Sequence, residues 1–159
     1  GRSPPRMRRR GQGELALERV CERAQGRKTF GNYLHERDHA ADMIADSRIE
    51  IDQARLLVLK TAWMIDEVGT REARKEIAMI KALVPKMQTR IVDRAMQVFG
   101  AMGMSPDTPL ADLYPWGRAL RYADGPDAVH LRSIARMEIK ASRESLGEAA
   151  RYLTVPERL

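Results

Sequence analysis

One carboxylate stands at a sharp turn in the stretch from Arg121 to Asp127. Gly125 permits backbone angles closed to other residues, and Pro126 suits the first turn of a helix because it has no N–H to leave unpaired. The chain is therefore predicted to turn at Asp124 and to present a side chain capable of acid–base chemistry beside a helix start. Taken alone, the pattern also fits an ordinary loop in which Asp127 favours the dipole of the next helix.

Two further stretches combine residue types that are unusual for plain helix ends. Arg27 and Phe30 place a guanidinium and an aromatic ring beside a glycine. Gln97 places an amide at a predicted helix end, where Gly100 and Ala101 would let a flat ligand approach the backbone closely. Each stretch by itself is more often structural, as an exposed arginine or a helix C-cap.

Two histidines four residues apart, His35 and His39, enclose Glu36 in the pattern of the zinc metalloproteases. That pattern needs both imidazoles on one helix face, but the segment straddles a predicted boundary between loop and helix. A third ligand is also hard to find. The paired Glu-x-x-His motifs of di-iron bundles are missing as well. No metal site is therefore predicted.

The elements that must position these residues are helices. Gly13 to about Arg27 shows helical spacing, and a connector over 28–34 follows it. Thr70 is the predicted N-cap of a third helix that runs to Phe99, with a bend expected upstream of Pro85. Residues 100–104 are predicted to be a flexible loop. The remaining helices are expected over 38–68, from 107–109 to about 120, and after Asp124 to about Ser145.

These helices predict an all-α fold, an antiparallel four-helix bundle with an additional C-terminal helix. The second helix carries one apolar stripe through Ile44, Ile51 and Ile65 and a second through Leu56 and Trp63. It is therefore expected to contact neighbours on two sides. The predicted domains are a basic arm over 1–12, the bundle over 13–145 and a tail over 146–159.

Composition narrows the classes of partner. The net charge is +6, but five arginines lie in the first ten residues, and without them 23 basic side chains face 22 acidic ones. A nucleic-acid footprint outside the arm is therefore not predicted. No apolar run approaches the roughly 20 residues that cross a bilayer. The single cysteine, Cys21, excludes an internal disulfide framework and fits a reducing compartment.

Taken together, the arginine–phenylalanine–glycine element, the glutamine helix end and the acidic turn resemble the acyl-CoA dehydrogenase family. Their order and separations are similar to those of its C-terminal all-helical domain, over about Arg2 to Lys140. The run Ala-Asp-Gly-Pro-Asp with His130 is most similar to the branch of acyl-CoA dehydrogenase family members ten and eleven. The family's preceding helical and β domains are not in this sequence, so the isolated chain is expected to be inactive.

The resemblance implies α,β-dehydrogenation of an acyl-CoA thioester with FAD as cofactor. A carboxylate takes the α-proton while a hydride leaves the β-carbon for the flavin. Asp124 falls where the family has its catalytic carboxylate, usually a glutamate, and Gly125 would pass close to the thioester. Arg2 matches an arginine near the thioester end of the substrate. Pro126 and Ala128 stand at positions facing the flavin, where the family commonly has threonine and glutamine.

The same resemblance implies a cofactor shared between subunits. Arg27 is similar to the residue that pairs with the FAD pyrophosphate of a neighbouring subunit, and Phe30 would lie along that nucleotide. Gln97 and Gly100 resemble the wall for the adenine half, with Ala101 replacing the usual second glycine. A homo-oligomer, dimer or tetramer, is therefore expected to form through the bundle.

Two other functions stay open at this point. A non-enzymatic oligomerisation or interaction module would explain the wide apolar surface of the second helix equally well. A nucleic-acid binder working through the basic arm is the less favoured alternative. It predicts a steep salt dependence that should vanish when the first ten residues are deleted. The compartment is unassigned: cytoplasmic for a bacterial protein, mitochondrial or peroxisomal for a eukaryotic one.

Overall fold

A computed structural model describes residues 11–146, and almost all of them are helical. Residues 1–10, with Arg2, Pro4 and Pro5, and residues 147–159 lie outside the described residues, so the proposed arm and tail stay predictions. The described helices, in chain order, are α2 (Gln12–Gly26), α3 (Asp38–Val68), α4 (Arg74–Phe99), α5 (Leu110–Ala119) and α6 (Asp127–Leu146). No described helix is long and apolar enough to cross a membrane.

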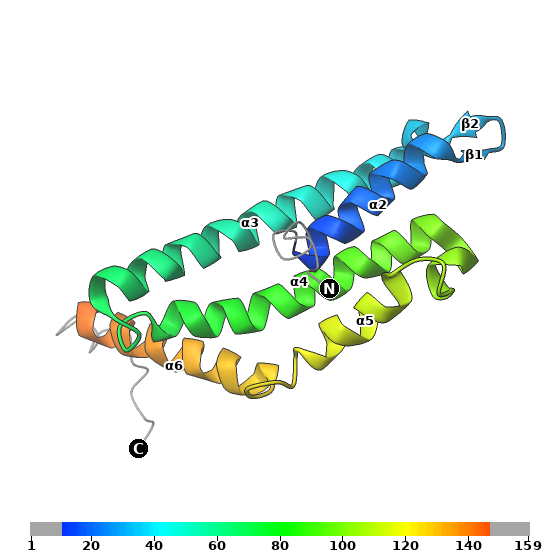
Figure 1. Ribbon diagram of the computed structural model, residues 1–159. Helices are drawn as coiled ribbons and strands as arrows, with labels where there is room; N and C mark the ends of the chain where they lie inside the picture. The colour runs from blue at the N-terminus through cyan, green and yellow to red at the C-terminus, as the bar shows by residue number, and fades with distance from the viewer. Residues whose placement is uncertain (1–10, 147–159) are drawn as a thin grey trace, which may run out of the picture.

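The predicted antiparallel bundle is confirmed, with the last two helices sharing one position in it. Figure 1 shows α2 and α3 on one side of α4, and α5 and α6 following each other along its other side. Helix α4 contacts the four other helices that the structure describes. The chain therefore breaks between α5 and α6 beside the middle of the central helix, and this break carries the acidic turn.

The core gathers around α4, which contributes the largest fully buried side chains, Ile91 and Val92, together with Leu110 of α5. Small residues on α2 let its backbone approach: a Cβ on Gly13 would lie 3.6–3.7 Å from Ile91, Ile51 and Met87. The predicted helical stripe on α4 accounts for this arrangement, since buried positions recur along its whole length. Pro85 lies inside α4 as expected.

Helix α3 begins and ends where its sequence pattern predicts, but it packs on one side only. Its buried face holds Ser47, Ile51, Ala54 and Thr61. The second apolar stripe is exposed within the single chain, with Trp63 62% accessible. The expectation of neighbours on two sides is therefore wrong for the isolated chain.

Three local predictions are corrected. Thr70 does not cap α4, because residues 70–73 form a turn and Ala73 is the N-cap. The connector over 28–34 contains a two-stranded antiparallel hairpin, β1 (Lys28–Thr29) with β2 (Asn32–Tyr33), and the start of a 3-10 helix, η1 (Leu34–Glu36). The segment expected to be a flexible loop is a second 3-10 helix, η2 (Gly100–Met104).

Candidate active site

The acidic turn has a backbone conformation that side chains other than glycine seldom adopt. Asp124 has a φ of 54° and Gly125 a φ of 105°, so two successive residues are left-handed. Aspartate is among the residues that tolerate this region best, and glycine enters it without steric cost. The prediction of a sharp turn at Asp124 is therefore confirmed. Pro126 and Ala128, beyond the turn, are both exposed.

The Asp124 carboxylate points away from the core. Its side chain is 86% exposed, and Lys81 of α4 places its Nζ 3.2 Å from Oδ2. The backbone carbonyl of the same residue accepts a hydrogen bond from Nε2 of His130, at 3.2 Å. An ion pair this exposed contributes little free energy and breaks easily. The backbone of Asp124 is thus held in place, while its carboxylate oxygens stay accessible.

Asp127, three residues further on, has the opposite surroundings. It is the first residue of α6, as predicted, and its side chain is only 15% exposed. Arg121 donates from Nε to Oδ2 at 2.7 Å, and Lys86 lies 3.6 Å from the same oxygen. Burial by itself would raise the pKa of Asp127, but hydrogen bonding and charge from Arg121 and Lys86 outweigh it and leave this pKa lowered. The dipole of α6 is therefore only one of the charges that Asp127 meets, beside those of Arg121 and Lys86.

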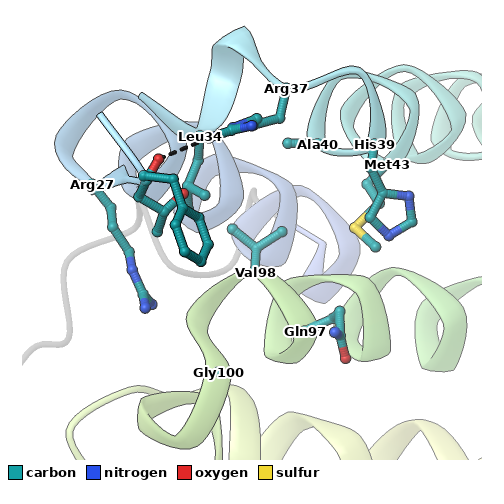
Figure 2. Close-up of a pocket in the computed structure, with 11 residues that line it drawn as sticks. Arg27, Leu34, Arg37, His39, Ala40, Met43, Gln97, Val98 and Gly100 are labelled. Atoms are coloured by element: carbon teal, nitrogen blue, oxygen red, sulfur yellow. Dashed lines mark hydrogen bonds between the residues drawn. The ribbon is translucent and has the colours of Figure 1, made fainter. Parts of the chain in front are cut away.

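A cavity of about 450 Å³ lies where the hairpin, α3 and the end of α4 meet. Figure 2 shows Arg27 reaching from the end of α2 toward Gly100, and Gln97 on α4 also lines the cavity. Nη1 of Arg27 donates to the Phe99 carbonyl at 3.5 Å. Gly100 has a φ of 65°, and a Cβ there would lie 3.9 Å from the Arg27 guanidinium. Four of the sequence-predicted residues, Arg27, Phe30, Gln97 and Gly100, therefore line one cavity.

Phe30 occupies the tip of the hairpin, is 99% exposed and has a φ of 50°. Ala101 is exposed in η2, next to Gly100, but does not line the cavity. The opposite wall comes from residues that sequence reasoning missed, His39 and Met43 of α3 among them. Arg37, also missed, donates to the Thr29 carbonyl at 2.9 Å and so ties the hairpin to the start of α3.

The acidic turn and this cavity are far apart in one chain. Lys81, which contacts Asp124, and Gln97, which lines the cavity, are both on α4. The rise of an α-helix over that separation is about 24 Å. One subunit therefore offers two distinct sites rather than one continuous one.

A second cavity, of about 470 Å³, lies between the start of α4 and α6. Its walls include Arg74, Arg132 and Arg136, the hydroxyl-bearing Ser133, and two apolar residues. Arg132 and Arg136 are four residues apart and so share a helix face. Within the described part of the chain, none of the three arginines is ion-paired with a carboxylate. Three guanidiniums at one opening make this a candidate site for an anion.

The two histidines of the zinc-like pattern lie on different elements. His35 is in η1, where the carbonyl of Ala24 lies 3.1 Å from Nδ1, and His39 is in α3. Among residues 11–146, no group of three histidine, cysteine, aspartate or glutamate side chains is arranged to hold a metal ion.

Comparison with known proteins identifies this architecture. A family model described as the C-terminal domain of acyl-CoA dehydrogenase matches residues 2–139. The chain belongs to the acyl-CoA dehydrogenase family. Every site residue predicted from the sequence lies inside the matched range.

Relatives in this family are similar over most of the chain. A probable acyl-CoA dehydrogenase, FadE2, of Mycobacterium tuberculosis is 51% identical over 143 residues, which are 90% of this chain and 35% of that protein. Acyl-CoA dehydrogenase family member 11 of Gallus gallus is 51% identical over 133 residues, 84% of this chain and 17% of that protein. The chain thus spans about a third or less of the length of these acyl-CoA dehydrogenases.

Solved structures share the fold. A putative acyl-CoA dehydrogenase from Mycobacterium abscessus superposes with a TM-score of 0.82 at 43% identity, over 86% of this chain and 33% of that one. A structure described as an FAD complex of PigA gives a TM-score of 0.74 at 25% identity, over 80% of this chain and 32% of that one.

Proposed function

We propose that this chain is the C-terminal domain of an FAD-dependent acyl-CoA dehydrogenase, in which Asp124 takes the α-proton of an acyl-CoA thioester. The observation that carries the proposal is the exposed carboxylate on a left-handed turn at the break between α5 and α6. A carboxylate that contributes nothing to packing, on backbone that must be held in place, is typical of a functional group rather than a structural one.

The chemistry follows from what each side chain is free to do. When bound, FAD supplies the acceptor for the hydride that leaves the substrate's β-carbon. Of the two carboxylates at this turn, Asp124 is the one able to accept the α-proton. The Asp127 carboxylate is already engaged by Arg121 and Lys86. Gly125 brings backbone close to the thioester without a side chain in the way. Lys81 releases Asp124 at little cost, since their ion pair is exposed.

The cavity at Arg27 fits the nucleotide part of FAD. The Arg27 guanidinium can bind a pyrophosphate, and apolar neighbours such as Leu34 and Val98 can pack against the flat adenine ring. Because this cavity is about 24 Å from the acidic turn along α4, it serves the cofactor of a second copy of the protein. The PigA structure, described as an FAD complex, supports FAD as the cofactor of this fold.

The cavity at Arg132 and Arg136 gives the acyl-CoA a further attachment point. Coenzyme A carries phosphate groups, and guanidiniums bind phosphates with paired hydrogen bonds. Helix α6 runs from Asp127, beside the base, to Arg136, a rise of about 13 Å. This distance allows one thioester to place its acyl end at Asp124 and a phosphate among the arginines.

The test is Asp124→Asn in the full-length protein, which keeps the shape of the side chain and removes the proton acceptor. Reduction of bound flavin by acyl-CoA is expected to slow about a hundredfold to ten-thousandfold. The absorbance of bound FAD reports whether the cofactor is retained, and it is expected to be unchanged. Near-normal flavin reduction by this variant would overturn the assignment of the base. Dehydrogenase activity is expected to be absent from the isolated 159-residue chain.

A second candidate function is favoured by the exposed apolar stripe on α3. A helical oligomerisation module without enzymatic activity would also need such a surface. The same full-length preparation separates the two, because an interaction module would carry no FAD and would show no flavin spectrum to reduce.

A further inference from the structure

The strained turn at Asp124 needs something to hold it. Left-handed backbone at a residue other than glycine costs free energy and persists where the surroundings enforce it. Asp124 and Gly125 are left-handed in succession, and the Asp124 side chain is almost free of contacts except for Lys81. His130 holds the Asp124 carbonyl at 3.2 Å, and the rest of the restraint must come from residues on either side of the turn.

An ion pair joins the two ends of the turn. Arg121, just after α5, donates from Nε to Oδ2 of Asp127 at 2.7 Å, and its Nη2 lies 2.6 Å from the same oxygen. The pair spans Asp124 symmetrically, three residues before it and three after it. It thus fixes the separation of the two chain ends between which the left-handed residues stand.

The pair is also attached to the central helix. Lys86 of α4 reaches the same Oδ2 at 3.6 Å. The other oxygen, Oδ1, is buried and has no hydrogen-bond partner within residues 11–146. The carboxylate is therefore held through a single oxygen. Three nitrogens converge on it, and a change of charge at either Arg121 or Asp127 breaks the ion pair that joins the two ends of the turn.

We propose that Arg121 and Asp127 are positioning residues, whose ion pair, tied to α4 by Lys86, sets the place of the Asp124 carboxylate relative to the α-carbon of bound acyl-CoA. This proposal rests on the function proposed above. General-base catalysis depends on geometry before anything else, and a displacement of about 1 Å can cost a hundredfold in rate. Neither residue touches the reacting atoms.

Simple stabilisation of the fold is the rival explanation, and the chain contains a matched control. Lys75 and Glu138 also join α4 to α6, at 2.8 Å, but their pair lies on the surface and does not flank the turn. Removing it tests whether any ion pair between these helices affects the reaction.

The experiment is a double-mutant cycle in the full-length protein with Arg121→Gln, Asp127→Asn and both together. Three quantities are measured: kcat and KM for an acyl-CoA, and the isotope effect with substrate deuterated at the α-carbon. Each single variant is expected to lower kcat about ten- to a hundredfold, with KM within about twofold, and to raise the isotope effect because proton removal becomes slower. The double variant is expected to cost less than the sum of the two single ones, because both break the same Arg121–Asp127 ion pair. FAD content is expected to stay unchanged.

The control variant Glu138→Gln is expected to keep kcat and the isotope effect of the parent. Four outcomes would overturn the proposal: kcat within about twofold of the parent in both single variants, costs that add in the double variant, an unchanged isotope effect, or an equal loss in Glu138→Gln. Failure of the base assignment is separate, since it would appear as near-normal rates in Asp124→Asn.

Discussion

At the scale of single residues, the lowered pKa of Asp127 makes the stability of the protein depend on pH. A carboxyl group whose pKa is lower in the folded state stabilises the protein above its unfolded pKa and loses that contribution as pH falls through the folded value. Because the ordinary value is 3.8, the contribution is expected to be complete near neutral pH and to disappear at acid pH below that value. Asp127→Asn is expected to lower the free energy of unfolding at neutral pH by about 1.5–3 kcal/mol.

Denaturant unfolding of the parent and the variant across this pH range measures the effect. The two curves are expected to converge in acid, where the parent carboxylate is protonated. Glu138→Gln, which removes an exposed carboxylate, is expected to differ from the parent by less than about 1 kcal/mol at every pH. A constant difference between Asp127→Asn and the parent down to the lowest pH would show that ionisation is not the cause.

The chemistry of the turn could be predicted from local sequence, but its restraints could not. Gly125 and Pro126 indicate a turn wherever they fall, so the exposed carboxylate of Asp124 follows from neighbours in the chain. The partners Lys81 and Lys86 lie far upstream on α4 and become neighbours only when the bundle packs. The local sequence also gave no reason to expect Arg121 to bind Asp127 rather than to point into solvent.

At the scale of elements, η2 shows why a glycine-rich segment need not be a flexible loop. Gly103 is buried, and a Cβ there would lie 2.9 Å from Cα and 3.0 Å from the carbonyl oxygen of Met96. Gly103→Ala would therefore push η2 away from α4, since backbone cannot rotate aside as a side chain can. We expect a loss of stability of about 1–3 kcal/mol, measured by thermal unfolding.

The matched control is Gly26→Ala. This glycine ends α2 with a backbone angle open to alanine, and nothing lies within 4 Å of its Cβ position. Its replacement is expected to be neutral or to stabilise the chain by up to about 1 kcal/mol, because alanine restricts the unfolded state. Equal losses in both variants would mean that packing against Met96 is not what fixes η2.

Long helices were predictable where a periodic apolar pattern runs over many turns, and short elements were not. Helix α3 has the predicted bounds because Gly69 ends a sustained pattern. The hairpin has two residues in each strand, too few for an alternating pattern to show. Thr70 has the right chemistry for a cap, but the turn after Gly69 delays α4 until Arg74. Tertiary packing decides such boundaries.

At the scale of the whole molecule, the sites follow from the position of α4. It contacts every other helix among residues 11–146, so the cavity at its end, the arginine cavity at its beginning and the turn beside its middle are all fixed to one rigid element. The sequence predicted four of the residues that line the first cavity through family resemblance. It did not predict the arginine cavity, although Arg132 and Arg136 are one helical turn apart, because Arg74 comes from a distant segment.

The exposed stripe on α3 predicts self-association of the chain. Ile49, Leu56 and Trp63 recur every seven residues with Leu59 between them, and all four side chains are exposed. This is the spacing by which one helix packs along another. Such a helix is about 46 Å long, enough for an interface of ordinary size. Leu56→Glu with Leu59→Glu is expected to convert the associated chain to a monomer in sedimentation velocity at high protein concentration.

Burial of the stripe between two copies makes a charge there costly, because a glutamate would lose its water without gaining a partner. Leu131→Glu supplies the control: this leucine is also exposed, but it lies on α6, outside the stripe. It is expected to leave the sedimentation coefficient of the parent unchanged, and circular dichroism is expected to show the same helix content in all variants. A parent chain that sediments as a monomer, or a Leu131→Glu variant that dissociates as fully as the double variant, would remove α3 as the interface. Since the Arg27 cavity is proposed to serve a second copy, a monomeric full-length protein would be expected to lose FAD as well.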